Sequence, residues 1–129
     1  MPYIEVVAAV LRQDNKFLIA KRKADQHVGG KWEFPGGKIE KEETPEACLK
    51  RELFEEFGIE ANVDSFFMES RFDYGDKQIR LLLYYATHIS GIFELHVHDE
   101  IRWVSKDELA NYEFVNADIP IAAKLAADM

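Results

Sequence analysis

The chain has 129 residues, of which 47% are hydrophobic and 31% charged, and its formal net charge at pH 7 is −8. These proportions are typical of a folded globular protein and exclude intrinsic disorder over most of the length. The length fits one core, so we expect a single domain over residues 1–129. The negative charge opposes general attraction to nucleic acids or anionic membranes, so a small anionic substrate would need local cations.

The cysteine count and the N-terminal residues bear on the compartment. Cys48 is the only cysteine, so no intrachain disulfide forms, and Met1–Glu5 lacks the basic region and cleavage site of a signal peptide. Uninterrupted apolar stretches such as Leu81–Ala86 are too short for a membrane span. We expect a cytoplasmic monomer or homodimer that binds a small molecule and neither a nucleic-acid polymer nor a membrane.

Apolar runs separated by turn residues predict several strands. Val6–Leu11 and Phe17–Ala20 are expected to form a hairpin around residues 13–16. Trp32–Phe34 is expected to be a short strand that leads into a Pro-Gly-Gly turn. Further strands are expected at residues 63–72, 78–89 and 100–104, with a turn at 73–76.

Capping residues predict the helices. Thr44, Pro45 and Gly58 are typical of the N-cap, first position and C-cap of a helix over residues 45–57. A capping-box pattern at Ser105–Glu108 indicates a short helix, and an alanine-rich helix should run from Asp118 or Ile119 to Ala127. Strands before, between and after helices indicate the α/β (α+β) class, a central mixed sheet covered by helices.

The helix at residues 45–57 separates two arcs at about 100° per residue. The arc expected to pack consists of Ala47, Leu49, Leu53, Phe54 and Phe57. The other arc carries Glu52, Glu55 and Glu56. Carboxylates at these spacings repel one another, so they form either a solvated face or a site for hard divalent cations.

The residues upstream of this helix favour the cation site. Gly36, Gly37 and Lys38 can fold back beside the acidic arc as a loop with exposed backbone groups. A phosphate chain that carries a divalent cation suits such a place, because the metal bridges carboxylates and phosphate oxygens. Arg22 and Lys38 are candidates to contact the remaining phosphate oxygens.

These residues also spell a known pattern. Gly37, Glu43 and the run from Arg51 to Ile59 match every fixed position of G-x5-E-x7-R-E-U-x-E-E-x-G-U, where U is aliphatic. The chain therefore resembles the Nudix hydrolase superfamily. The stretches Trp32–Glu40 and Ala117–Pro120 resemble its MutT-like branch, which includes CTP pyrophosphohydrolases.

The resemblance implies an α/β/α sandwich and an enzyme that cleaves nucleoside triphosphates to a monophosphate and pyrophosphate by water attack at the β-phosphorus. It implies Mg²⁺ as the cofactor, with Mn²⁺ as an alternative. The implied metal ligands are Glu52, Glu55, Glu56 and the Gly36 carbonyl. Glu43 and Arg51 are implied to form a supporting salt bridge, which could equally be an ordinary helix-end ion pair.

Residues outside the motif leave alternatives open. Glu100 is either an extra acid that reaches the metals or a strand-end carboxylate, since Arg102 occupies the position before the tryptophan where related proteins carry the acid. Glu52, Glu55 and Glu100 are the candidates for the general base. His96 and His98 alternate like a metal pair, but nothing upstream completes a zinc site, so we expect them to face solvent.

The resemblance also suggests a base pocket. Phe34 either contacts the base or packs in the core. Asp118 lies where MutT-like enzymes read the base, and it is also expected to cap the last helix. Where 8-oxo-dGTP specialists carry asparagine this chain has aspartate, as CTP-hydrolysing relatives do. Asn116 is a second candidate, with turn formation as its other role.

Three functions compete. The first is a MutT-like enzyme that removes 8-oxo-dGTP or related nucleotides from the nucleotide pool, as in DNA repair. The second is a CTP- or dCTP-preferring pyrophosphohydrolase. The third is a non-catalytic nucleotide sensor, which the retention of all three helix glutamates disfavours. We expect Cys48 to be a small half-buried side chain and not a nucleophile, because no histidine is placed to activate it.

Overall fold

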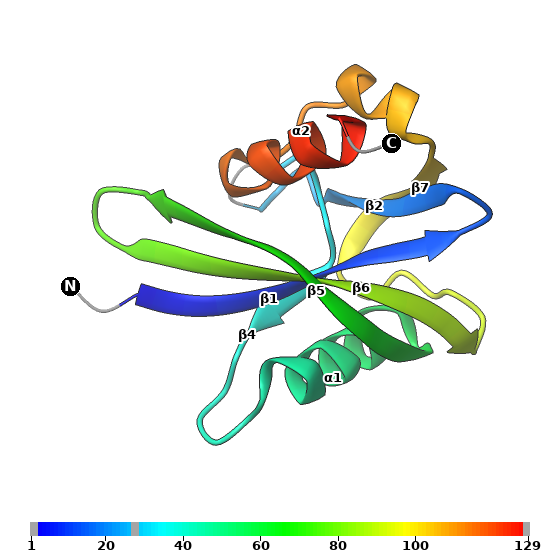
Figure 1. The fold of residues 1–129 in the computed structure, drawn as a ribbon, viewed down its shortest axis with the longest axis horizontal. Helices are drawn as coiled ribbons and strands as arrows, with labels where there is room; N and C mark the ends of the chain where they lie inside the picture. Colours follow the sequence, from blue (N-terminus) through cyan, green and yellow to red (C-terminus); the bar gives the residue numbers. More distant parts are fainter. Residues whose placement is uncertain (1–2, 27–28, 128–129) are drawn as a thin grey trace.

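The computed structural model describes residues 3–26 and 29–127, which form one mixed sheet with helices on both faces (Figure 1). The strands are β1 (Tyr3–Gln13), β2 (Lys16–Arg22), β3 (Trp32–Glu33), β4 (Gly36–Lys38), β5 (Glu60–Asp73), β6 (Gln78–Ser90) and β7 (His98–Val104). The helices are α1 (Pro45–Phe57) and α2 (Ile119–Ala127), and the 3-10 helices η1 (Lys106–Asn111) and η2 (Asn116–Asp118) precede α2. The predicted fold class is therefore confirmed. Within the described ranges, no helix has the length and apolar character needed to cross a membrane.

Two strands, β2 and β4, pair with different parts of β1 and so separate from each other. The sheet order is β3-β2-β1-β6-β5, with β4 beside β1 and β7 beside β2. β1 and β6 run parallel along Tyr3–Leu11, whereas β4 pairs with β1 at Val6–Ala8. β2 pairs with β1 only at the hairpin end, at Arg12 and Gln13. β2 and β4 therefore diverge, and Arg22 at the far end of β2 lies beyond the two residue pairs that join β2 to β1.

Two cores fill the layers because β1 is buried on both faces. Val7, Ala9 and Leu11 point to the side covered by α1, and Ala8 and Val10 point to the side covered by α2. A strand buried on both faces is a continuous apolar run and not an alternating one. This is why Val6–Leu11 was identifiable as a strand from its sequence.

The predicted ends of α1 are both correct. The Thr44 hydroxyl accepts a hydrogen bond from the Ala47 N–H at 3.1 Å. Gly58 ends the helix in the left-handed region, with φ at 70°, and its N–H donates to the Phe54 carbonyl. Such a conformation is easiest for glycine, which has no Cβ to clash.

Two local predictions were wrong. Gly36 and Gly37 form strand β4 instead of a turn, because they pair with Ala8 and Val7 of β1. On α1, Ala47 is exposed and Phe54 is 65% exposed. The side of the helix that carries Cys48 and Glu56, both buried, faces the sheet. The helix is therefore rotated about its axis relative to the expected orientation.

The rotation of α1 predicts opposite outcomes for adjacent residues. Leu53→Ala should lower the free energy of unfolding by about 2–5 kcal/mol, because the side chain is fully buried and its loss leaves a cavity. Phe54→Ala, the matched control on the same helix, should change it by about 0.5 kcal/mol or less. Urea denaturation of both variants checks this, and equal losses would contradict the orientation of α1.

Candidate active site

Glu52 and Glu56 lie one turn apart on the side of α1 that meets β4. They continue a line that starts at Cys48, whose buried thiol is 3.2 Å from the Lys38 carbonyl oxygen. The Glu52 side chain is 15% exposed and Glu56 is 9% exposed. Glu55, on the neighbouring line, has a side chain that is 56% exposed. The helical spacing thus delivers two carboxylates into the contact between α1 and β4 and a third to its rim.

The two glycines of β4 make this contact possible. A Cβ at Gly36 would lie 1.9 Å from the Val7 carbonyl oxygen. A Cβ at Gly37 would lie 2.3 Å from the Glu52 Cδ. A side chain at Gly36 would push β4 away from β1, and one at Gly37 would displace the Glu52 carboxylate. The Glu52 carboxylate therefore lies directly against the β4 backbone.

Arg51 organises the acidic groups around it. Its Nε and Nη2 donate to the two oxygens of Glu43 at 2.7 and 3.0 Å, a two-pronged ion pair. Its Nη1 donates to Glu52 at 2.8 Å and to Glu55 at 3.1 Å. Hydrogen bonds from Arg51, together with a backbone bond within the loop, lower the pKa of Glu43 to about 2. The predicted Glu43–Arg51 salt bridge is present, and it joins the loop before α1 to the helix.

Glu56 is a buried carboxylate without a full set of partners. Burial, followed by the charges of Glu52 and Glu33, raises its pKa well above the usual range. Among the described residues, none forms a hydrogen bond with its Oε1. A carboxylate buried beside like charges is costly unless a cation joins it.

This environment fits a divalent cation. Oxygen donors are what hard cations prefer, and a cation would relieve the repulsion at Glu56. In the part of the chain that the structure describes, no three metal-ligating side chains already converge on one point. Arg51 instead holds the carboxylates of Glu52 and Glu55.

A hollow lined by several charged side chains, called the polar hollow below, opens beside this contact, between β2 and β4. It brings together most of the predicted phosphate- and metal-binding residues. Its lining includes Arg22, Glu33, Gly36, Lys38, Glu56 and His98. Two cationic side chains thus face the same space as a buried carboxylate.

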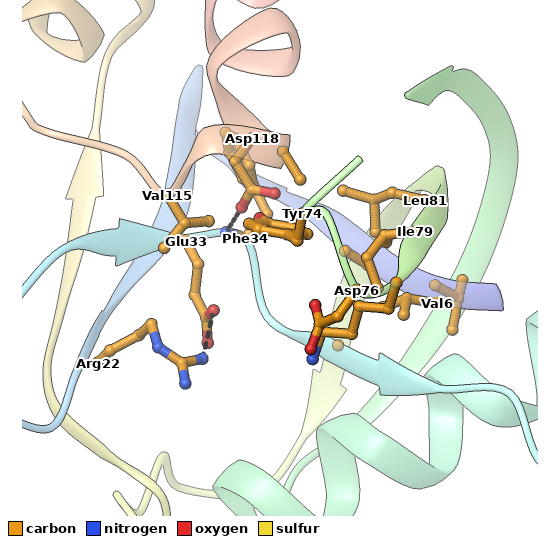
Figure 2. Close-up of a pocket in the computed structure, with 15 residues that line it drawn as sticks. Val6, Arg22, Glu33, Phe34, Tyr74, Asp76, Ile79, Leu81, Val115 and Asp118 are labelled. Carbon is orange, nitrogen blue, oxygen red and sulfur yellow. Dashed lines mark hydrogen bonds and ion pairs between the residues drawn. The ribbon is translucent and has the colours of Figure 1, made fainter. Parts of the chain in front are cut away.

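A second hollow, of about 500 Å³ and largely apolar, adjoins the first (Figure 2). That volume is within the usual range for small-ligand sites. Phe34 is buried in its wall and stacks on Phe114, with ring centroids 5.3 Å apart. Tyr74 and Asp76, from the turn between β5 and β6, close the side opposite Glu33 and Arg22 (Figure 2). The lining suits an aromatic ring.

Asp118 lies at the inner end of this apolar hollow. Its Oδ2 accepts a hydrogen bond from the Phe34 N–H at 2.8 Å, across 84 residues of sequence. It is the last residue of η2 and directly precedes α2, which begins at Ile119. Burial raises the pKa of Asp118 to about 8; the bond from Phe34 lowers it in part, and the Glu33 charge raises it further. The buried Ser70 hydroxyl donates to the Ala117 carbonyl at 3.0 Å and so anchors the turn that carries Asp118.

The two hollows share a wall. Val6, Arg22, Glu33 and Gly36 line both of them. Arg22 donates to Glu33 at 3.0 Å, and this pair stands at the junction (Figure 2). A ligand with a flat ring and a charged tail could therefore occupy both spaces at once.

Glu100 is not brought to the α1 carboxylates. Its neighbours on β7, Ile101 and Trp103, pack with the core beneath α1. Glu100 pairs instead with Arg102, whose guanidinium lies 5.8 Å from the centre of the Trp32 ring in the other core. Alternation along the strand places Glu100 on the opposite face of the sheet from α1.

Two other expectations need correction, and one open alternative is resolved. His98 is 4% exposed and not solvent-facing, whereas His96 is exposed. Cys48 is fully buried and not half-buried, and burial, with a hydrogen bond to Glu43, raises the pKa of its thiol to about 12, as expected of an inert cysteine. Asn116 lies outside both hollows and accepts the Ile119 N–H, which is its turn-forming role.

Sequence reasoning missed Glu33, His98 and Tyr74 as site residues. Glu33 lies inside the Trp32–Glu40 stretch that carried the family resemblance, and this position could have identified it as a site residue. Tyr74 is an aromatic residue in a turn that is otherwise polar. His98 gave no local signal, because its burial depends on contacts with Glu33 and Phe57, distant in sequence.

Comparisons with known proteins agree with this geometry. A sequence model of the NUDIX domain matches residues 6–124. The CTP pyrophosphohydrolase of Escherichia coli K12 is 38% identical over 94% of this chain and 90% of its own length. The 8-oxo-dGTP diphosphatase of the same strain is 34% identical over 97% of this chain and 98% of its own. The solution structure of the Escherichia coli ORF135 protein superimposes with a TM-score of 0.86 at 37% identity, covering 95% of this chain and 88% of that one.

The burial of Asp118 predicts a pH-dependent stability. A carboxyl group whose pKa rises from 3.8 to about 8 on folding stabilises the fold below pH 4, and this contribution is lost as the pH rises towards 8. Asp118→Asn keeps an oxygen for the Phe34 N–H but does not titrate. The variant should therefore gain stability over wild type by up to about 1.4 kcal/mol per pH unit across this window.

Urea unfolding of both proteins between pH 4 and 9 measures this difference. Parallel pH profiles would show that Asp118 titrates normally and would contradict its placement.

Proposed function

We propose that this chain, which belongs to the Nudix hydrolase family, hydrolyses nucleoside triphosphates to a monophosphate and pyrophosphate. One observation carries the proposal: the acidic contact between α1 and β4 opens into a polar hollow that shares the Arg22–Glu33 wall with an aromatic-lined hollow. The first space suits a triphosphate with its cation, and the second suits a nucleobase.

The α1 carboxylates would hold Mg²⁺. Glu52, Glu55, Glu56 and the Gly36 carbonyl are the ligands that we assign. When bound, the cation neutralises the phosphate oxygens and activates a water for attack. Glu52 and Glu55 would have to leave Arg51 at least in part, and Arg51 would keep its two bonds to Glu43.

The phosphates would lie between these ligands and the cationic side chains. Arg22 and Lys38 face the polar hollow and would bind oxygens that the cation does not reach. Glu52 and Glu55 remain the candidates for the general base, because Glu100, the third candidate, lies on the opposite face of the sheet.

The base would lie against Phe34 with its edge towards Asp118. One Asp118 oxygen accepts the Phe34 N–H, which leaves the other for the base. A carboxyl group can accept from an exocyclic amine when ionised and can donate when protonated. We therefore propose 8-oxo-dGTP and related nucleotides as substrates, with CTP and dCTP as the second candidate. The 34% identity over 97% of this chain to an 8-oxo-dGTP diphosphatase supports the first candidate. The aspartate at position 118 and the 38% identity to a CTP pyrophosphohydrolase support the second.

The test is a hydrolysis panel that resolves monophosphate from pyrophosphate. 8-oxo-dGTP, dGTP, dCTP, CTP and 5-methyl-dCTP are compared with Mg²⁺ and with EDTA. We expect pyrophosphate release from at least one nucleotide and none with EDTA. Release of orthophosphate, or no reaction with any nucleotide, would reject the proposal, and binding without hydrolysis would point to a nucleotide sensor.

Glu56→Gln should lower kcat by several orders of magnitude, because the amide cannot replace a charged metal ligand. Glu46→Gln, on the first turn of the same helix, removes the same charge away from the cluster and should leave kcat unchanged. Calorimetric titration with Mg²⁺ should show weaker binding for Glu56→Gln alone. A Glu56→Gln enzyme that keeps wild-type turnover at saturating Mg²⁺ would refute the ligand assignment.

A further inference from the structure

His98 is a buried histidine that the proposed chemistry does not use. It is the first residue of β7 and lies opposite Arg22 of β2. The register shifts between Lys21 and Arg22, so that Glu100 faces Lys21 and Asp99 has no partner in the ladder. Irregularities of this kind change the direction in which a side chain points. Here the His98 ring lies against the Phe57 ring of α1, with centroids 5.6 Å apart and planes 14° apart.

His98 bonds the residue that holds Arg22. Its Nε2 is 2.8 Å from Glu33 Oε2, and the other oxygen of Glu33 accepts from Arg22 at 3.0 Å. Because a carboxylate only accepts hydrogen bonds, Nε2 carries the proton. The buried Nδ1 has no hydrogen-bond partner among the described residues, so the bond to Glu33 is the one that orients the ring.

We propose that His98 is a positioning residue for substrate binding. By fixing one oxygen of Glu33 it directs the other at Arg22, and it thereby holds the guanidinium at the junction of the two hollows. This inference rests on the proposed function, in which Arg22 binds a phosphate. A cation held in place before the substrate arrives loses less conformational freedom on binding, so the effect falls on affinity and not on the chemical step.

The surrounding structure distinguishes this role from simple packing. The aromatic face of His98 packs on Phe57, and its nitrogen bonds Glu33. His98→Phe keeps the aromatic packing and loses the donor, whereas His98→Gln keeps a donor and loses the ring. If His98 only fills space, phenylalanine is the better replacement; if it positions Glu33, glutamine is.

The experiment measures kcat, KM and thermal unfolding for both variants with the best nucleoside triphosphate of the panel and Mg²⁺. We expect His98→Phe to raise KM about tenfold, the effect of losing a hydrogen bond to a charged group, with kcat within about twofold of wild type. His98→Gln should keep KM within about threefold. In an Arg22→Ala background, His98→Phe should raise KM no further.

A matched control is available on β6. His88 also bonds an oxygen through Nε2, 2.8 Å from the Gly91 carbonyl, and packs beside a phenylalanine, Phe93. His88→Phe should leave KM unchanged. A wild-type KM in His98→Phe, a tenfold rise in His98→Gln, or additive effects with Arg22→Ala would overturn the proposal.

A second measurement does not depend on turnover. ¹⁵N NMR of the free protein should show His98 protonated at Nε2 and a motionally restricted Arg22 guanidinium, which becomes mobile in His98→Phe and stays restricted in His98→Gln. Equal mobility of Arg22 in all three proteins would overturn the positioning role even if the enzyme is active. An inactive protein with the expected Arg22 signals would instead reject only the proposed function.

Discussion

The close approach of α1 to β4 is the constraint on which the site depends. Two glycines let the β4 backbone lie between β1 and the helix, and the Glu52 carboxylate occupies the volume that a side chain at Gly37 would fill. The same contact buries Glu56 and exposes Phe54. The two glycines of β4 therefore determine both where the helix packs and where its carboxylates lie.

This packing concentrates negative charge in a chain that is already acidic. Arg51 offsets part of it by bonding three glutamates at once, but Glu56 stays buried beside like charges. Ionising a carboxyl group in this place is costly, and a bound cation would offset that cost. The cation would then attract the anionic phosphates that the net charge repels, and Arg22 and Lys38 add positive charge to the lining of the same hollow.

Local signals explain what could be read from the sequence. The caps at Thr44 and Gly58 delimit α1, and the turn chemistry and apolar runs delimit the long strands, because these features act within a few residues. The carboxylate spacing on α1 also follows from helix geometry alone. The rotation of that helix could not be predicted in this way. Cys48 and Glu56 are buried by contacts with β4, and the periodicity of the helix sequence does not show those contacts.

The rest of the site arises from long-range contacts. Asp118 meets Phe34, and His98 meets Glu33, only because the sheet brings distant strands together. The shift in register next to Arg22 turns His98 inwards, and the strand alternation that follows carries Glu100 to the opposite face. The position of Glu100 shortly before Trp103 suggested it as a further acid. A shift of one residue along a strand, however, moves a side chain to the opposite face of the sheet.

The central claim is that a divalent cation lies between α1 and β4, and paramagnetic Mn²⁺ locates it directly. In a titration followed by ¹H–¹⁵N spectra, the amide signals of Gly37 and Glu56 should broaden first, at sub-stoichiometric Mn²⁺, and excess Mg²⁺ should restore them. Broadening that begins at the exposed acids Glu40 and Glu42, or that leaves Gly37 and Glu56 sharp, would contradict the account.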